Sequence, residues 1–201
     1  MRLILASASP RRRELLGAAG IAFVAQSTNI PEIPAPGEQP RAFAERLARE
    51  KALAIAAGHQ DDAVLGADTI VVVDQLILGK PADARDAERM LRLLCGRTHE
   101  VITAVCVIAP GEVREQKTSS MKSGFVSPDV RSESTQVTFS RLSEQEIAFY
   151  ISTGEPMDKA GAYGIQGIAS RWIPRIEGDY SNVVGLPIAL VYRMLREHQL
   201  L

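Results

Sequence analysis

The sequence predicts a mixed α/β fold in which helices flank a twisted sheet. Short apolar runs rich in Val and Ile alternate with amphipathic stretches of helical period along the 201 residues. This alternation is irregular, and turn signals join neighbouring strands as hairpins, which argues against a regular doubly wound sheet. Because the sequence contains no internal repeat and no linker-like stretch, we expect a single domain over residues 1–201.

The predicted elements of the first half follow from capping and turn signals. Ser9 followed by Pro10 is a favoured helix start, and Gly20 is a favoured helix end. Asp74 and Gln75 separate two apolar runs as a hairpin turn. On this basis we expect strands at 3–6, 23–27, 64–73 and 76–78, and helices at 10–20, 41–57 and 83–94.

The second half contains a less organised segment. Residues 117–134 are rich in Ser, Lys and Asp, which is typical of a mobile insertion within a domain. Ser143 and Glu146 have capping-box spacing, so we expect a helix from there to about residue 152. The other predicted elements are strands at 100–108, 137–139 and 172–176, a ligand-contacting loop and strand at 157–167, a turn at 178–182 and a closing helix at 187–198.

The composition argues against partnership with nucleic acid or membrane. The formal net charge is −1, whereas a dedicated nucleic-acid binder is usually basic. No apolar run approaches the roughly 20 residues that a membrane helix needs, and the apolar start is too short for a signal peptide. The two cysteines lack CxxC spacing, so we expect a reduced, cytoplasmic protein. The three scattered histidines do not fit a histidine zinc site.

One carboxylate interrupts the most apolar strand of the chain. Asp68 lies within the predicted strand 64–73, where Val, Ile, Leu, Gly and Ala dominate. Burying an ionised carboxylate costs several kcal/mol unless a cation or hydrogen bonds compensate. We therefore expect Asp68 to face a cleft or to lie against a metal or basic side chains. A structural carboxylate that caps a turn or pairs with an arginine is the alternative.

Three consecutive arginines, Arg11, Arg12 and Arg13, fall in the first turn of the predicted helix at 10–20. The helix dipole disfavours cations at that end. The pattern makes sense if an anion binds there, because free backbone amides and guanidinium groups then converge on it. A solvated basic run is the alternative.

Further charged residues occur at positions that suit a polyphosphate. Lys51 lies beside the apolar side of a helix, Lys80 stands between a glycine and a proline, and Lys159 follows an aspartate. Glu32, in a proline-rich connection, is either a metal ligand or a surface charge, and a lysine such as Lys51 can equally extend to solvent. Together with Asp68 the set suits phosphoryl chemistry, which needs cations for the phosphate oxygens and a carboxylate to hold a metal or activate water. A P-loop is excluded because no GxxxxGK[ST] stretch exists.

Six segments make the chain similar to the Maf family of nucleoside triphosphate pyrophosphatases, also called septum formation inhibitor proteins. They are LASASPRR at 5–12, REKA at 49–52, LGADT at 65–69, GKP at 79–81, DKAGAYGIQ at 158–166 and NVVGLP at 182–187. Each motif is weak alone, but the six occur in family order and span nearly the whole chain.

The resemblance implies a two-lobed mixed α/β fold of the Maf/ITPase type, with the site in a central cleft and often with a homodimeric assembly. It also implies hydrolysis of a nucleoside triphosphate between the α and β phosphates with Mg²⁺ or Mn²⁺, giving a monophosphate and pyrophosphate. The motif around Gln166 favours the branch that acts on dTTP and UTP, with modified pyrimidine nucleotides as related candidates.

The resemblance also implies roles for individual residues. Asp68 corresponds to the proton acceptor, and Arg11, Thr69 and Gln166 correspond to positions linked to substrate choice. An amide such as that of Gln166 offers both a donor and an acceptor to a pyrimidine edge. We further expect Lys51 and Lys80 to act in catalysis, Glu32 to share the metal with Asp68, and Ser7, Arg12 and Lys159 to bind substrate. Asp179 stands where a serine is expected, which would add negative charge near the rim of the site.

Two functions of other classes compete with the enzyme. The first is a nucleotide-sensing regulatory protein that inhibits septum formation through a protein partner, with residues 117–134 as the contact. The second is an RNA-binding module, which the near-neutral charge and the lack of paired stacking aromatic residues disfavour.

Overall fold

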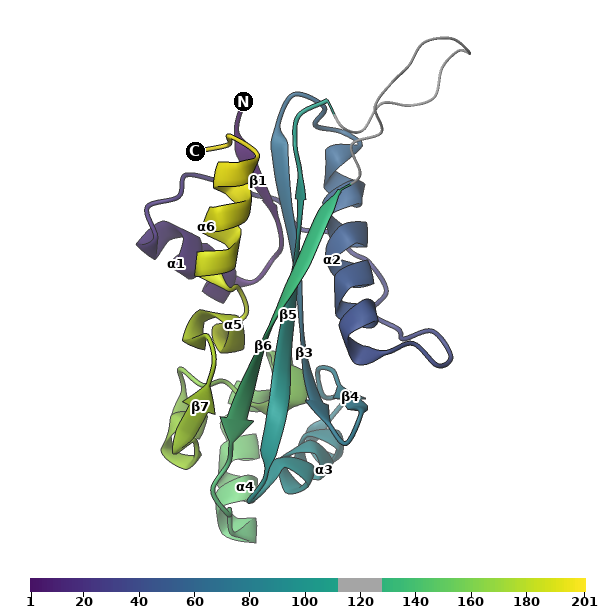
Figure 1. The fold of residues 1–201 in the computed structure, drawn as a ribbon. Helices are drawn as coiled ribbons and strands as arrows, with labels where there is room; N and C mark the ends of the chain where they lie inside the picture. Colours follow the sequence, from purple (N-terminus) through teal and green to yellow (C-terminus); the bar gives the residue numbers. More distant parts are fainter. Residues whose placement is uncertain (112–127) are drawn as a thin grey trace.

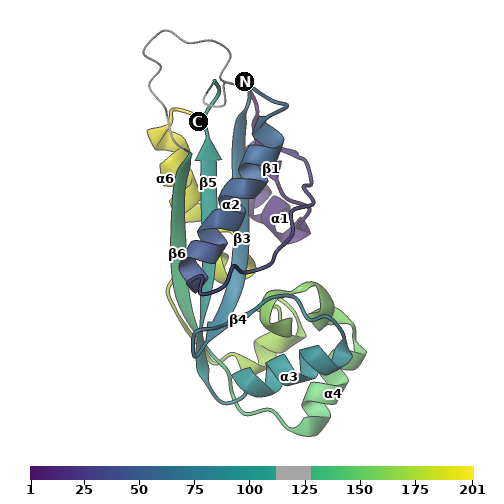
Figure 2. The same ribbon diagram turned by 90° about the vertical axis from the view of Figure 1, so that its right-hand side faces the viewer.

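The computed structural model describes residues 1–111 and 128–201. A long twisted sheet runs through the molecule, and helices gather around its two ends (Figures 1 and 2). The strands are β1 (Leu3–Ala6), β2 (Val24–Ala25), β3 (Ala63–Val73), β4 (Leu76–Leu78), β5 (Thr98–Ile108), β6 (Asp129–Thr138) and β7 (Arg175–Glu177). The α-helices are α1 (Pro10–Ala18), α2 (Pro40–Ala56), α3 (Ala84–Leu94), α4 (Glu144–Ser152), α5 (Tyr180–Val184) and α6 (Ile188–Glu197). Three short 3₁₀ helices are η1 (Glu155–Asp158), η2 (Ala160–Ala162) and η3 (Ile168–Trp172).

The sheet is mixed, as the sequence predicts. Its strand order is β2-β1-β3-β5-β6-β7, and β4 also pairs with β3. β1 runs parallel to β2 and β3, whereas the other pairs are antiparallel. The predicted hairpin turn between β3 and β4 is confirmed: Asp74 and Gln75 have φ values of 50° and 64°, the left-handed pair that matches the twist of the flanking strands.

Strands β3, β5 and β6 belong to both ends of the molecule. β3 pairs with β5 from Val64 opposite Ile108 to Val72 opposite Glu100, and β6 continues the ladder beside β5. We call the end with α1, α2 and α6 the upper lobe, and the end with α3, α4 and the 3₁₀ helices the lower lobe; Figure 2 shows the strands passing from one to the other. Both lobes are therefore built on one continuous sheet.

Apolar clusters hold the helices to the sheet. In the upper lobe α2 buries Phe43 and Leu47 against one face, while α6 buries Met194 with its neighbours against the other. In the lower lobe Tyr150 and Trp172 belong to a third cluster with α3. Full burial of one such side chain stabilises the fold by about 1.5–3 kcal/mol. The capping box predicted at the start of α4 is also confirmed.

Gly66 of β3 allows α2 to lie close against the sheet. A Cβ at this position would overlap the carbonyl oxygen of Ala48 and lie 2.8 Å from the Cβ of Ala52. Because side chains two residues apart on a strand share a face, Asp68 also points toward α2. Lys51 follows Ala48 by three residues and lies on the same side of the helix. The close contact at Gly66 thus places Lys51 beside Asp68.

The prediction of a mobile insertion over 117–134 is wrong for residues 129–134, which form part of β6. The sequence did not indicate a strand here because its side chains are mostly polar and bind polar neighbours instead of packing into an apolar core. Ser132, for example, donates a hydrogen bond to Glu45 at 2.7 Å and accepts one from Arg41 at 2.6 Å, both on α2. Residues 117–127 lie outside the described residues.

Three other predicted segments differ from the structure. In the strand predicted at 172–176, Trp172 ends η3 and β7 begins only at Arg175. The stretch 157–167 contains η1 and η2 rather than a strand, because Gly161 takes a left-handed φ of 68° that ends any extended run. The predicted turn at 178–182 contains the start of α5, whose N-cap is Asp179: its carboxylate accepts hydrogen bonds from the backbone of Ser181 and Asn182. None of the helices in the described ranges is long and apolar enough to cross a bilayer.

Candidate active site

A gap in the edge of the sheet opens the site. β1 pairs with β3 only as far as Ala6 opposite Gly66, and β4 joins the same edge at Val71. Among the described strands none covers positions 67–70 on that side. Asp68 and Thr69 lie in this gap, and because successive side chains of a strand point to opposite faces, both faces of the sheet contribute to the cleft.

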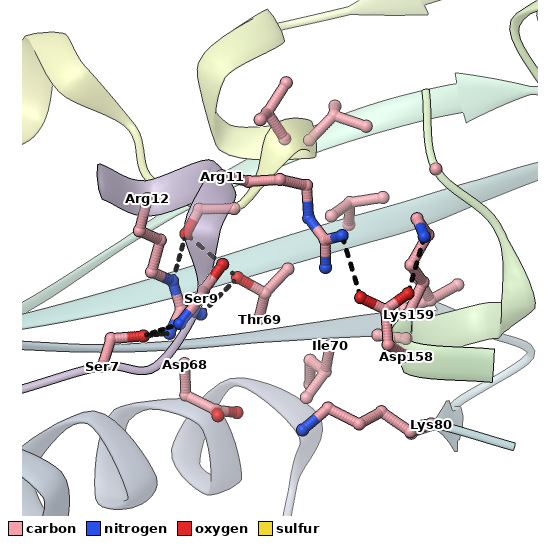
Figure 3. Close-up of a pocket in the computed structure, with 18 of the residues that line it drawn as sticks. Ser7, Ser9, Arg11, Arg12, Asp68, Thr69, Ile70, Lys80, Asp158 and Lys159 are labelled. Atoms are coloured by element: carbon pink, nitrogen blue, oxygen red, sulfur yellow. Dashed lines mark hydrogen bonds and ion pairs between the residues drawn. The ribbon is translucent and has the colours of Figure 1, made fainter. Parts of the chain in front are cut away.

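The gap borders a cavity of about 770 Å³, a size typical of small-molecule sites. Both lobes contribute to its wall, which Figure 3 shows in close-up. Asp179 and Arg13 are not among the lining residues, so the charge predicted near the rim and the third arginine of the predicted anion site lie elsewhere. All ten residues that the sequence singles out for the site line the cavity: Ser7, Arg11, Arg12, Glu32, Lys51, Asp68, Thr69, Lys80, Lys159 and Gln166.

Lys51 lies between two carboxylates. Its ammonium nitrogen Nζ is 2.6 Å from Asp68 Oδ1 and 2.6 Å from Glu32 Oε1. Lys51 and Asp68 are both buried, and Lys80 Nζ lies 3.6 Å from the other oxygen of Glu32. The expectation that a carboxylate in an apolar strand needs a cation is therefore confirmed, with lysine rather than arginine as the direct partner.

The two carboxylates differ in their affinity for a proton. Burial raises the pKa of Asp68 above its ordinary value, and the neighbouring Lys51 and Arg12 only partly offset this effect. Burial also raises the pKa of Glu32, but the hydrogen bond and charge of Lys51 and the charge of Lys80 outweigh it, so that pKa is lowered. Asp68 is thus the better proton acceptor of the two, which is the property that a general base requires.

Arg12 is buried and held by four hydrogen bonds. Its Nε donates to the carbonyl oxygen of Gly185 at 2.8 Å, and its Nη1 donates to Ser7 Oγ at 3.1 Å and to the carbonyl oxygen of Ala67 at 2.9 Å. Its Nη2 donates to Thr69 Oγ1 at 3.0 Å. Four of the five N–H groups of the guanidinium therefore bind the protein itself. Arg12 ties β1, β3 and the end of α5 together, and it offers a ligand only its remaining N–H group.

The hydroxyl of Thr69 is also engaged by protein groups. Besides accepting from Arg12, Thr69 Oγ1 lies 2.9 Å from Thr103 Oγ1 and 3.3 Å from the carbonyl oxygen of Gly185. Thr103 Oγ1 in turn donates to the carbonyl oxygen of Asn182. Since the hydroxyl has a single hydrogen, Thr69 supports the wall of the cavity and keeps at most one acceptor lone pair for a ligand.

An ion pair joins the upper and lower lobes across the cavity. Arg11 Nη1 lies 3.3 Å from Asp158 Oδ2, and Lys159 Nζ lies 2.6 Å from Asp158 Oδ1 (Figure 3). The ammonium of Lys159 also donates to the carbonyl oxygen of Glu155 at 2.6 Å. Asp158 therefore faces two cations that come from different lobes, and it was not among the residues predicted for the site.

Gln166 lies on the exposed side of the lower-lobe wall. It occupies a turn in which the N–H of Gly167 donates to the carbonyl oxygen of Gly164 at 3.1 Å. Within the described residues its side-chain amide makes no hydrogen bond that would commit it to the protein. Its donor and acceptor are thus left to a ligand in the cavity.

The donor set fits a divalent cation that is held partly by a substrate. Glu32 and Asp68 come from two segments, and each has one carboxylate oxygen bound to the ammonium of Lys51. The second oxygen of Asp68, Oδ2, accepts no hydrogen bond within the described residues. The described ranges contain no group of three or more His, Cys, Asp or Glu side chains that could hold an ion by itself. Mg²⁺ is usually bound by one or two carboxylates together with substrate phosphates. The carboxylates of Glu32 and Asp68 therefore fit a site in which phosphate oxygens of a substrate supply the remaining ligands of the ion.

Sequence reasoning missed the supports of the site. Asn182 is buried: its Oδ1 accepts from the N–H of Thr103, and its Nδ2 donates to the carbonyl oxygen of Val101 and to Thr135 Oγ1. Together with Asp179 it anchors α5 on the sheet, and Gly185 then reaches Arg12. The NVVGLP motif was visible in the sequence, but no local pattern told which strands its asparagine would contact.

Comparison with known proteins shows which family the chain resembles. The sequence profile of the family described as Maf-like protein matches residues 2–198. The dTTP/UTP pyrophosphatase of Koribacter versatilis is 55% identical over 197 residues, which are 98% of this chain and 94% of that protein. The dTTP/UTP pyrophosphatase of Syntrophomonas wolfei is 51% identical over 191 residues, which are 95% of this chain and 94% of that protein.

The fold is also similar to that of the Staphylococcus aureus Ham1 protein. That structure aligns with a TM-score of 0.50 and 12% identity, and the match covers 98% of this chain and 99% of that one. This likeness concerns the fold alone. Because the family profile covers nearly the whole sequence and a relative shares more than half of the aligned residues, the chain belongs to the Maf family.

Proposed function

We propose that the protein hydrolyses the α–β phosphoanhydride of dTTP and UTP, giving the nucleoside monophosphate and pyrophosphate. The two relatives described above are named dTTP/UTP pyrophosphatases. The observation that carries the proposal is the buried pair of Asp68 and Lys51 in a cavity lined by further cations. Such a site offers a proton acceptor together with groups that stabilise phosphate charge, which are the two requirements of phosphoanhydride hydrolysis.

In this proposal Asp68 accepts the proton of the attacking water. The water oxygen bonds to one phosphorus atom of the anhydride while the bridging P–O bond breaks, and the leaving phosphate takes the electron pair. Lys51, at 2.6 Å, favours the ionised form of Asp68 and partly offsets the rise in its pKa that burial causes. Lys80, Arg11 and Lys159 face the same cavity and stabilise the charge that develops on the phosphate oxygens.

The base is read at the lower-lobe wall. Gln166 offers a donor and an acceptor to a pyrimidine edge. Thr69 and Arg12 act on substrate choice by fixing the shape of the opposite wall, because their polar groups are largely used within the protein. Ser7 shares this role, since its hydroxyl accepts from Arg12 and from the N–H of Ser9.

Glu32 and Asp68 are the residues that would hold Mg²⁺ or Mn²⁺. When bound, such an ion supplies Lewis-acid polarisation of the phosphoryl oxygens. Lys51 and Lys80 keep Glu32 ionised, which suits a metal ligand. We expect chelation of divalent ions to abolish turnover and added Mg²⁺ to restore it.

A panel of nucleoside triphosphates with separate detection of pyrophosphate and orthophosphate tests the function. We expect dTTP and UTP to yield equal amounts of monophosphate and pyrophosphate, and Asp68→Asn to lose this activity. Release of orthophosphate as the main product, or no turnover of any triphosphate, would refute the proposal.

The regulatory alternative gains no support from the described part of the chain. Of residues 117–134, which were to supply its partner contact, 129–134 are paired within the sheet, and 117–127 lie outside the described residues. The homodimer and the cytoplasmic location stay predictions, and sedimentation of the purified chain checks the first of them.

A further inference from the structure

A short turn with a glycine at each end carries Gln166 into the cavity. Gly164 and Gly167 are its first and last residues, closed by the 3.1 Å hydrogen bond between them. A Cβ on Gly167 would collide with the carboxylate of Glu155, and a Cβ on Gly164 would lie 2.6 Å from Cε of Lys159. The two glycines therefore let the turn lie close against the side chains of Glu155 and Lys159.

The carboxylate of Glu155 holds the far end of this turn directly. The N–H of Ile168 points between the two carboxylate oxygens, at 3.1 Å from Oε1 and 3.2 Å from Oε2. Hydrogen bonds to a charged acceptor are stronger than those between neutral groups. This contact fixes the residue that immediately follows Gly167.

The same carboxylate holds the near end through one intermediary. Tyr150 Oη donates to Glu155 Oε1 at 3.0 Å and accepts from the N–H of Gly164 at 3.2 Å. Tyr150 is fully buried on α4, so its ring cannot turn away without disrupting the lower-lobe core. The two ends of the turn are thus tied to a single side chain.

The backbone of Glu155 contacts the phosphate-binding side of the site. Its carbonyl oxygen accepts from Lys159 Nζ at 2.6 Å, and that ammonium also binds Asp158. Glu155 therefore contacts the segment that presents Gln166 and the lysine proposed to bind phosphate. Its side chain binds the turn, and its backbone binds the lysine.

We propose that Glu155 is a positioning residue that fixes the Gly164–Gly167 turn and thereby sets the preference for pyrimidine bases. The inference rests on the proposed function of Gln166 in reading the base. Without the carboxylate, a turn bounded by glycines gains backbone freedom, which binding of a nucleotide must then remove. The side chain of Gln166 is then less well positioned, and kcat/KM differs less between pyrimidine and purine nucleotides.

Amide hydrogen exchange tests the clamp without any need for activity. In Glu155→Ala we expect faster exchange at both Gly164 and Ile168. In Tyr150→Phe, which keeps the buried ring, we expect faster exchange at Gly164 alone. The control is Glu144→Ala, which removes an exposed carboxylate of α4 that pairs with Arg92; both amides should keep the exchange of the unchanged protein. Equal protection of both amides in Glu155→Ala and the parent overturns the clamp.

The ratio of kcat/KM for dTTP to that for GTP tests the effect on specificity. Glu155→Ala should lower the ratio by about tenfold, the equivalent of roughly 1.4 kcal/mol, mainly by raising KM for dTTP. Glu155→Gln keeps an acceptor oxygen and should restore most of the ratio. A ratio that stays constant while exchange rises, or an equal loss of rate on both nucleotides, overturns the inference.

Gln166→Ala separates this inference from the proposed function. If Gln166→Ala leaves the base preference unchanged, the proposed role of Gln166 is wrong, and the inferred link from Glu155 to specificity falls with it. If Gln166→Ala lowers the preference but Glu155→Ala does not, the proposed function stands and only the positioning role of Glu155 is refuted.

Discussion

Lys51 Nζ lies 2.6 Å from Asp68 Oδ1, and both side chains are buried. Gly66 makes this pair possible because it lets α2 approach β3 more closely than any larger residue would. The pair lies where no strand of the described residues pairs with that edge of β3, so a ligand can reach a carboxylate that is otherwise enclosed. Its consequences for rate, pH dependence and stability can each be measured.

Lys51→Met should move the acid limb of the kcat/KM profile to higher pH. Asp68 accepts a proton only when ionised, so the rate rises with pH through its pKa. Burial already raises that pKa, and Lys51 opposes the rise; removing the ammonium therefore raises the pKa further. The measurement is kcat/KM for dTTP between pH 4 and pH 9. An acid limb at the same pH in both proteins would show that Lys51 does not control the ionisation of Asp68.

Asp68→Asn should lower kcat by about 10²–10⁴-fold, the usual contribution of a positioned general base. The amide has nearly the same shape but cannot accept the proton. Single-turnover measurement of pyrophosphate release checks the loss. Asp74→Asn is the matched control, because Asp74 is exposed in a hairpin turn and its left-handed φ suits asparagine. Near-normal release by Asp68→Asn would remove Asp68 from the chemistry.

Arg12→Lys should lower the free energy of unfolding by about 1–3 kcal/mol, because an ammonium cannot reproduce four hydrogen bonds made in fork geometry and leaves buried acceptors unpaired. Arg13→Lys, at an exposed neighbouring position, should change it by less than about 0.5 kcal/mol. Urea unfolding of both variants provides the comparison. Equal stability of the two would contradict the structural role assigned to Arg12.

Gly66→Ala should destabilise the protein by about 1–3 kcal/mol and also slow turnover. The added methyl group overlaps the backbone of α2, so the helix must shift and carry Lys51 away from Asp68. Gly17→Ala is the control: it lies in α1 with open space around it and should stabilise the helix by about 0.5–1 kcal/mol. Thermal unfolding and dTTP turnover of both variants check the pair of outcomes. Unchanged turnover in a destabilised Gly66→Ala would separate the helix contact from the chemistry.

The sequence was sufficient to predict most of the main elements, and the ten residues assigned catalytic, binding or metal roles all line one cavity. An apolar strand interrupted by Asp68 required a cation by elementary electrostatics, and Lys51 is that cation. The hairpin at Asp74 and the capping box at Ser143 were predicted from local turn and capping chemistry, and both are present.

The features that the sequence did not predict depend on contacts between distant segments. Arg11 and Arg12 are neighbours with the same side chain and both line the cavity, yet Arg11 pairs with Asp158 of the other lobe while Arg12 is buried and bound by Ser7, Thr69 and Gly185. The difference depends on where α5 ends against β3, because Gly185 at that end accepts a hydrogen bond from Arg12. The local sequence pattern does not predict this contact between distant segments. Strand β6 was missed for the same reason, since its polar residues have partners on distant elements: Ser132 on α2, Arg131 on α6 and Ser134 on β5.

The unbroken ladder of β3, β5 and β6 has a mechanical consequence. The two lobes are connected by hydrogen-bonded strands and not by a flexible tether, so widening the cleft means bending the whole ribbon. Such bending would strain the hydrogen bonds between the strands along their whole length. The opening of the cavity is therefore expected to resist widening. We therefore expect the exposed contact between Arg11 and Asp158, which bridges the two lobes, to limit the access of a nucleotide to the cavity.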